Sequence, residues 1–108
     1  MPQFIFVYLG GDYPKDPKEG EKHLEKYQDW LTALGDSVVS PAIPFKDTYT
    51  VHPDGKTEPG TTTLMSGMSI LKFESMQAAL EAAKSCPFRE INGTLENSEM
   101  INMSETEH

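Results

Sequence analysis

The chain has 108 residues, nine of them basic and seventeen acidic, which gives a formal net charge of −8. This length forms one domain, and burying roughly 65% of its unfolded surface is enough for a single core. The acidic balance argues against nucleic-acid binding, because phosphate contacts require a basic surface. No stretch approaches the length of a membrane span. The single cysteine, Cys86, excludes an internal disulfide and fits a reducing compartment, so we expect a cytoplasmic protein.

The first predicted elements are a strand and a helix. Residues 3–9 (QFIFVYL) are rich in aromatic and β-branched residues, which predicts a strand. Apolar residues occupy both alternation phases, which is typical of a central strand with both faces covered. Helical periodicity then runs from about residue 18 to 34, with Asp16 as a candidate N-cap, Pro17 in the first turn and Gly35 at the end.

The middle of the chain predicts a short strand followed by an arm. The strand is expected at residues 37–40, and the segment 41–63 is broken by four prolines. Within it, Pro53-Asp54-Gly55 is a strong turn signal and predicts a small hairpin. His52 lies beside this turn, where we expect it to be exposed and inert.

The remaining segments predict a strand, a helix and a strand. Residues 67–73 alternate well enough for the third strand of the main sheet, and Ser75 caps a helix over 76–85. A final strand is expected at 94–103, and residues 104–108 are expected to be a disordered tail. Four side chains of this second helix are expected to pack inward: Met76, Ala79, Leu80 and Ala83.

This order predicts an α+β fold of the ferredoxin-like type, βαββαβ, with a small hairpin arm. Right-handed crossovers place both helices on one face of an antiparallel four-stranded sheet. We expect one domain over residues 1–103, with the arm at about 41–63. The sheet face without helices also carries apolar residues, so we expect it to be buried against a second copy in a homodimer.

His23 is the first candidate for chemistry, because it lies on the apolar side of its helix with Tyr27 and Trp30. An imidazole that faces a core requires a polar partner, and an unsatisfied one costs about 1–3 kcal/mol. Histidine also gains and loses a proton near neutral pH. His23 is therefore a candidate general base, and the alternative is a structural histidine that only makes a hydrogen bond.

The predicted topology brings other polar side chains to the same edge of the sheet as His23. The first strand ends there, the third strand begins there, and the second helix finishes there. The side chains expected around His23 are Tyr8, Ser66 and Ser69, with Asp12 and residues 86–88 (Cys-Pro-Phe) at the rim and Phe6, Tyr27 and Trp30 as an apolar floor. Such a site suits a small aromatic or acidic ligand.

Each of these residues also has a structural interpretation. The Tyr8 hydroxyl could simply reach water at the sheet edge, Asp12 could be a turn former, and Cys86 could be a small buried apolar side chain. No pair of His, Cys or carboxylate residues has metal-ligand spacing, and Gly10-Gly11 alone does not make a phosphate loop. We therefore expect neither a metal nor a cofactor.

Four segments together resemble the YCII-related domain proteins: QFIFVYLGG, EGEKHLEKYQDWLTALGDSVVSP, SGMSILKFESMQAALEAAKSCPF and INGTLENSEMINM. The similarity covers nearly the whole chain. The related DGPF-type members carry Asp-Gly-Pro-Phe in the arm, and here Asp54-Gly55 is followed by Lys56-Thr57, so that signature is half present.

The resemblance implies a dimeric α+β barrel made of two ferredoxin-like subunits whose sheets face each other. It also implies a recurring histidine in the first helix, matched here by His23. Many members carry Asp-Pro after the second helix, and that Asp is the partner of the histidine. This chain has Cys86-Pro87 instead, which puts a His–Asp activity in question or changes it to a thiol-assisted variant.

Two functions follow from these observations. The first is a small acid–base enzyme, lyase- or isomerase-like, in which His23 is the general base and Tyr8 or Ser69 orients the substrate. The second is a non-catalytic dimeric protein that binds a ligand or has a regulatory role, in which His23 only donates a hydrogen bond.

Overall fold

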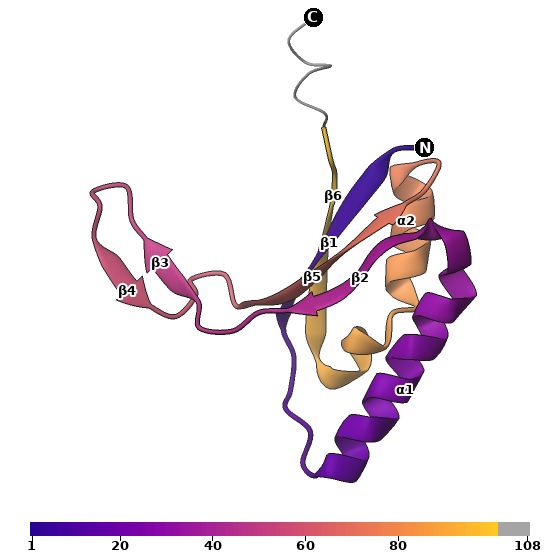
Figure 1. Cartoon of the computed structure of the whole chain (residues 1–108), viewed down its shortest axis with the longest axis horizontal. Coiled ribbons are helices and arrows are strands. Elements are labelled where there is room, and N and C mark those ends of the chain that lie inside the picture. The colour runs from indigo at the N-terminus through magenta and orange to yellow at the C-terminus, as the bar shows by residue number, and fades with distance from the viewer. Residues whose placement is uncertain (102–108) are drawn as a thin grey trace, which may run out of the picture.

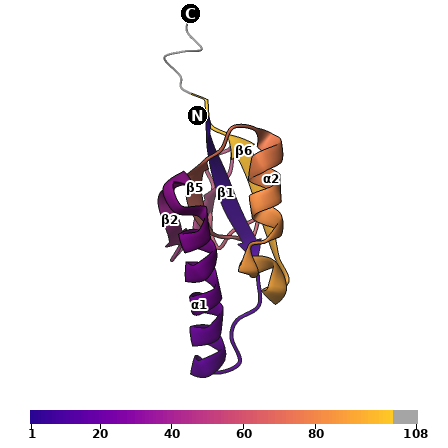
Figure 2. The same ribbon diagram turned by 90° about the vertical axis from the view of Figure 1, so that its right-hand side faces the viewer.

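The computed structural model describes residues 1–101 and consists of a four-stranded antiparallel sheet, two α-helices on one of its faces, and a separate hairpin (Figures 1 and 2). The strands of the main sheet lie in the order β2-β5-β1-β6, which is the ferredoxin-like order and confirms the predicted fold class. In chain order the elements are β1 (Gln3–Gly10), α1 (Pro17–Leu34), the 3₁₀ turn η1 (Gly35–Ser37), β2 (Val38–Pro44), β3 (Tyr49–Val51), β4 (Thr57–Pro59), β5 (Met65–Lys72), α2 (Met76–Lys84), the 3₁₀ turn η2 (Pro87–Ile91) and β6 (Gly93–Glu99). The predicted tail, 104–108, lies outside the described residues.

Strand β1 is central, as its apolar pattern predicts, because it pairs with both β5 and β6. Its alternate residues Phe4, Phe6 and Tyr8 face the helices and are buried. The residues between them, such as Ile5 and Val7, face the other way and are only half-buried. Within one chain, therefore, β1 is fully covered on the helix face alone.

Helix α1 begins and ends where the sequence predicts. The Asp16 side chain accepts a hydrogen bond from the backbone N–H of Glu19 at 2.8 Å, which satisfies one free donor of the first turn. Gly35 ends the helix with a φ of 55°, a conformation that glycine adopts without strain. The helix is tied to α2 by Trp30, whose Nε1 donates to the carbonyl oxygen of Ala82 at 3.0 Å.

Helix α2 is capped by Ser75 as predicted, but its buried face differs from the expected one. Ala79 and Ala83 are buried, whereas Met76 and Leu80 are exposed, Leu80 by 45%. The predicted inward packing of Met76 and Leu80 is therefore wrong. The helix turns a row of small side chains toward the core, which allows close approach to the sheet and points the larger ones outward: Ala78, Ala79, Ala82 and Ala83.

The segment between the main elements forms a longer strand and the predicted hairpin. β2 continues to Pro44 instead of ending at Ser40, because an edge strand tolerates proline where no ladder hydrogen bond is required. β3 and β4 pair antiparallel around the predicted turn and project away from the sheet (Figure 1). His52 is half-buried at this turn and pairs with Glu58 at 2.9 Å, so it has a structural contact there.

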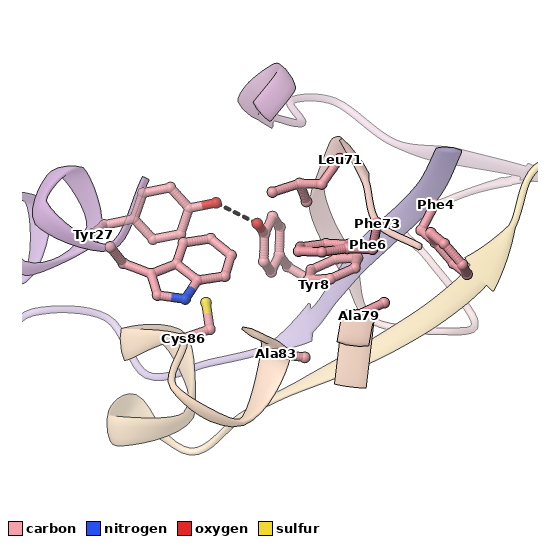
Figure 3. Packing of buried hydrophobic residues seen from close by; sticks show 10 residues of the cluster. Phe4, Phe6, Tyr8, Tyr27, Leu71, Phe73, Ala79, Ala83 and Cys86 are labelled. Atoms are coloured by element: carbon pink, nitrogen blue, oxygen red, sulfur yellow. Dashed lines mark hydrogen bonds between the residues drawn. The ribbon is translucent and has the colours of Figure 1, made fainter. Parts of the chain in front are cut away.

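The core lies between the helices and one face of the sheet and is mainly aromatic (Figure 3). Phe6 stacks on Phe73 with ring centroids 6.1 Å apart, and Tyr27 packs on Trp30 at 5.4 Å. Neither helix of the described chain combines the length and the apolar run that a membrane span requires.

Candidate functional site

A cavity of about 710 Å³ opens at the end of the sheet where β1 ends and α1 begins. This volume lies within the range of small-molecule sites. The first turns of α1 extend past the end of the sheet (Figures 1 and 2). Their side chains form one wall of the cavity. The other walls come from the β1–α1 loop, the end of β2, the start of β5 and η2.

The structure brings most of the predicted site residues together in this cavity. Five of them line it: Tyr8, Asp12, His23, Tyr27 and Ser66. Ser69 and Cys86 do not line it. Phe6 and Trp30, predicted as part of the floor, lie deeper and pack on each other in the core, with ring centroids 6.4 Å apart.

The His23 ring is half-buried at the cavity wall, one turn of α1 before Tyr27. Side chains four residues apart on a helix are neighbours. Within residues 1–101 the His23 ring makes no hydrogen bond and no ion pair. The His52 ring, in contrast, pairs with Glu58. The imidazole therefore has free nitrogens on the wall of the cavity.

The polar part of the floor is a row of three hydroxyl groups. Tyr8 hydrogen-bonds through its hydroxyl to Tyr27 (Figure 3) and to Ser69 Oγ, the latter at 2.6 Å. Burial raises the pKa of both tyrosines, so both phenols keep their protons at neutral pH. Ser69 does not line the cavity and is linked to it through its hydrogen bond with Tyr8.

The apolar wall depends on Phe88, whose ring lies edge-on to Tyr8 with centroids 5.2 Å apart. Two glycines make room for this ring. A Cβ at Gly11 would lie 2.8 Å from it, and one at Gly93 would lie 2.2 Å from it. Gly11 also has a φ of 90°, which disfavours other residues there. Gly11, Gly93 and Phe88 thus form one unit that holds an aromatic surface at the cavity.

A β-bulge shapes the opposite side of the cavity. Tyr8 pairs with Gly67 and Leu9 pairs with Met65, which leaves Ser66 as the extra residue of β5. Its Oγ donates to the carbonyl oxygen of Tyr8 at 3.1 Å. Ile43 also lines the cavity, and the sequence does not predict this, because the expected strand ends at Ser40 and β2 continues to Pro44.

At the rim, Asp12 is held by Asn92. The Asn92 side-chain amide donates to Asp12 Oδ2 at 2.5 Å, and the Asp12 backbone N–H donates to the carbonyl oxygen of Ile91 at 2.7 Å. These two bonds join the β1–α1 loop to η2. The carboxylate of Asp12 therefore has a structural partner as well as a position on the cavity.

Cys86 lies elsewhere than the rim position predicted from the sequence. It precedes Pro87, the first residue of η2, and its side chain turns into the core on the side of Tyr27 (Figure 3). Only 2% of Cys86 is exposed, and this burial raises the pKa of its thiol to about 11. The thiol is therefore protonated at neutral pH and outside the cavity, which argues against a thiol-assisted variant of the chemistry.

Titratable side chains at the cavity do not form a metal site. Among the residues that the structure describes, no three His, Cys, Asp or Glu side chains lie close enough to hold a metal ion. What the arrangement offers is an imidazole, two protonated phenols, a serine hydroxyl and an aromatic wall. These groups can bind a small ring compound and move a proton.

The fold and cavity define a ferredoxin-like α+β protein with a pocket of small-molecule size. One solved structure with this fold is 5-chloro-2-hydroxyhydroquinone dehydrochlorinase (TftG) from Burkholderia phenoliruptrix AC1100 in complex with 2,5-dihydroxybenzoquinone. The two chains are 12% identical, and the superposition covers 95% of this chain and 97% of that chain with a TM-score of 0.60. At this identity the likeness shows a shared fold. No protein-family model and no curated protein sequence matches the chain, so the resemblance to YCII-related proteins stays a prediction.

Proposed function

We propose that this protein binds a small aromatic or acidic compound in the cavity and performs acid–base chemistry on it, with His23 as the group that takes and returns a proton. The observation that carries the proposal is the His23 imidazole on the wall of a 710 Å³ cavity, without a hydrogen-bond partner within residues 1–101. A positioned general base of this kind contributes typically 10²–10⁴-fold to a rate.

The other titratable groups of the cavity fit this role less well. The phenols of Tyr8 and Tyr27 have raised pKa values because they are buried, so neither is a base at neutral pH. Asp12 already accepts a hydrogen bond from Asn92. In a lyase- or isomerase-like reaction, His23 would remove a proton from the substrate. The electron pair left behind would expel a leaving group or shift a double bond, and in the second case His23 returns the proton.

The structural neighbour supports the class of ligand. TftG is a dehydrochlorinase of a hydroxylated ring compound and was solved with a dihydroxybenzoquinone. In this chain the Phe88 ring and the two tyrosine rings offer an aromatic wall, and the hydroxyl pair of Tyr8 and Tyr27 leaves one donor for a compound of that type.

A non-catalytic ligand-binding or regulatory protein is the second candidate function. Among the described residues, no carboxylate hydrogen-bonds or forms an ion pair with His23, and this observation favours the second candidate. A catalytic base is usually oriented by a second group. In this case the imidazole would only hydrogen-bond the ligand.

We also propose that the protein is a homodimer through the sheet face that lacks helices. Ile5, Val7, Met68 and Ile70 all lie on that face and are half-buried in the single chain. An apolar surface on central strands is stabilised by burial against a second copy. YCII-related proteins would be expected to share this arrangement.

A thermal-shift screen of small aromatic and hydroxy acids tests the site. His23→Ala is compared with wild type, and His52→Ala on the hairpin is the matched control. A compound that stabilises wild type and His52→Ala, but not His23→Ala, supports a site built on His23. Turnover of that compound by wild type alone identifies an enzyme, and binding without turnover identifies a binder. Equal stabilisation of all three proteins removes His23 from the site.

A further inference from the structure

The three hydroxyl groups at the cavity floor differ in their access to the cavity. Ser69 is completely buried on β5, Tyr8 is 4% exposed, and Tyr27 is 9% exposed. Tyr8 contacts both of the others, so it is the middle member of the row. Tyr8 and Tyr27 line the cavity, and Ser69 does not.

The number of protons determines which hydroxyl donates and which accepts in each hydrogen bond of this row. Three hydroxyls carry three protons, and the two hydrogen bonds between them use two. Within the described chain, Ser69 Oγ has Tyr8 as its hydrogen-bond partner, so a Ser69 proton pointing away from Tyr8 would be buried without an acceptor. A buried unsatisfied polar group is strongly disfavoured. The favoured arrangement is therefore Ser69 donating to Tyr8 and Tyr8 donating to Tyr27.

In this arrangement Tyr27 accepts a hydrogen bond and keeps its own proton for the cavity. We propose that the Tyr27 hydroxyl is a dedicated hydrogen-bond donor of this cavity, and that the oxygen it binds is a phenolate, enolate or carboxylate oxygen of the ligand. A donor that itself accepts a hydrogen bond is polarised and becomes a better donor. A hydrogen bond to an anionic oxygen is also stronger than one to a neutral oxygen.

Two further observations fit an anionic oxygen at this point. Burial raises the pKa of Tyr27, so the hydroxyl stays a donor at neutral pH and does not compete as an anion. His23 lies one helical turn away on the same wall, so a ligand that reaches both groups has its oxygen at Tyr27 and its exchangeable proton near His23. The inference rests on the proposed small-molecule site and assigns the chemistry of the ligand that occupies it.

The test uses para-nitrophenol as the probe, because its absorbance spectrum separates the phenol from the phenolate. The full-length protein is titrated with the probe at several pH values. For wild type we expect the bound probe to be mostly phenolate at a pH where the free probe is a mixture, because a donor to the charged form lowers the pKa of the probe.

The diagnostic variant is Tyr27→Phe, which keeps the ring and removes only the hydroxyl. We expect it to weaken phenolate binding by roughly ten- to a hundredfold, which is the effect of one hydrogen bond to a charged group. Tyr49→Phe on the exposed hairpin is the matched control and is expected to bind like wild type. Circular dichroism establishes that each variant is folded.

Ser69→Ala gives a second measurement that does not alter the cavity lining. Loss of the first member of the row reduces the polarisation of Tyr27, and we expect phenolate affinity to fall by about two- to threefold. If Tyr27→Phe does not fold, unchanged binding by Ser69→Ala overturns the inference.

The outcomes separate this inference from the proposed function. Absence of probe binding to wild type, or equal phenolate affinity of wild type and Tyr27→Phe, overturns the donor role of Tyr27. Weaker binding by Tyr27→Phe together with wild-type thermal shifts for His23→Ala supports the donor and contradicts the role of His23. Unchanged phenolate binding by Tyr27→Phe, together with loss of the thermal shift in His23→Ala, supports the role of His23 and contradicts the donor role of Tyr27.

Discussion

The ring of Phe88 lies where a side chain at position 93 would have to be. A Cβ built on Gly93 would approach the ring to 2.2 Å, which is far inside van der Waals contact. The same ring lies against Tyr8 and lines the cavity. Gly93 on β6 therefore leaves the space that the Phe88 ring occupies, and in this way it affects the shape of the cavity.

Gly93→Ala is expected to lower the free energy of unfolding by about 1–3 kcal/mol, because an overpacked ring and its neighbours must shift. Urea unfolding measures this loss. The double variant Gly93→Ala with Phe88→Ala is the control, since removing the ring removes the clash. If the two substitutions have additive effects, Phe88 is not what excludes a side chain at position 93.

Local signals explain what the sequence predicts correctly. Asp16, Ser75 and Gly35 act on backbone groups within a few residues of themselves, so their roles can be recognised without the fold. The strand order then places His23 near Tyr8, because consecutive elements of a ferredoxin-like fold meet at known edges.

The remaining features depend on contacts between distant segments. The bulge at Ser66 arises from the pairing of two strands, and no pattern within β5 indicates it. The inward turn of Cys86 depends on the geometry of η2, and the exposure of Leu80 depends on how α2 is rotated against the sheet. Hydrophobic periodicity indicates that a helix has an apolar side, but it does not decide which of several apolar residues face the sheet.

Trp30→Phe is expected to weaken the link between the two helices. The indole N–H donates to the Ala82 carbonyl and also contacts Ser85 Oγ at 3.1 Å, and phenylalanine provides neither bond. We expect a loss of about 1–3 kcal/mol in the free energy of unfolding, since the ring volume also decreases. Chemical denaturation followed by circular dichroism measures it. A loss close to zero would mean that the aromatic packing alone joins the helices.

Val7→Lys is expected to disrupt the proposed homodimer. Val7 is half-buried on the sheet face without helices, and a buried unpaired ammonium group at a subunit interface is strongly unfavourable. Light scattering during gel filtration should give the dimer mass for wild type and the monomer mass for the variant. Gln28→Lys on the exposed side of α1 is the matched control and should stay dimeric. A monomeric wild type contradicts the dimer.

The buried thiol of Cys86 predicts that stability falls in alkali. Burial raises its pKa from 9.0 to about 11 in the folded chain, so between these values the unfolded chain releases a proton that the folded chain keeps. The unfolded state then binds fewer protons, and the free energy of unfolding decreases as pH rises through this range, by about 2 kcal/mol at most. Tyr8 and Tyr27, whose pKa values are also raised, act in the same direction above about pH 10.

Urea unfolding at a series of pH values, with wild type compared with Cys86→Ala, measures this dependence. The variant is expected to be less stable at neutral pH because it leaves a small cavity, but its stability should decline less between about pH 9 and 10. The decline that remains belongs to the two tyrosines, and adding Tyr27→Phe should reduce it further. Parallel pH profiles for wild type and Cys86→Ala would show that the thiol has the same pKa in the folded and the unfolded chain. That result is incompatible with the burial of the thiol beside Tyr27.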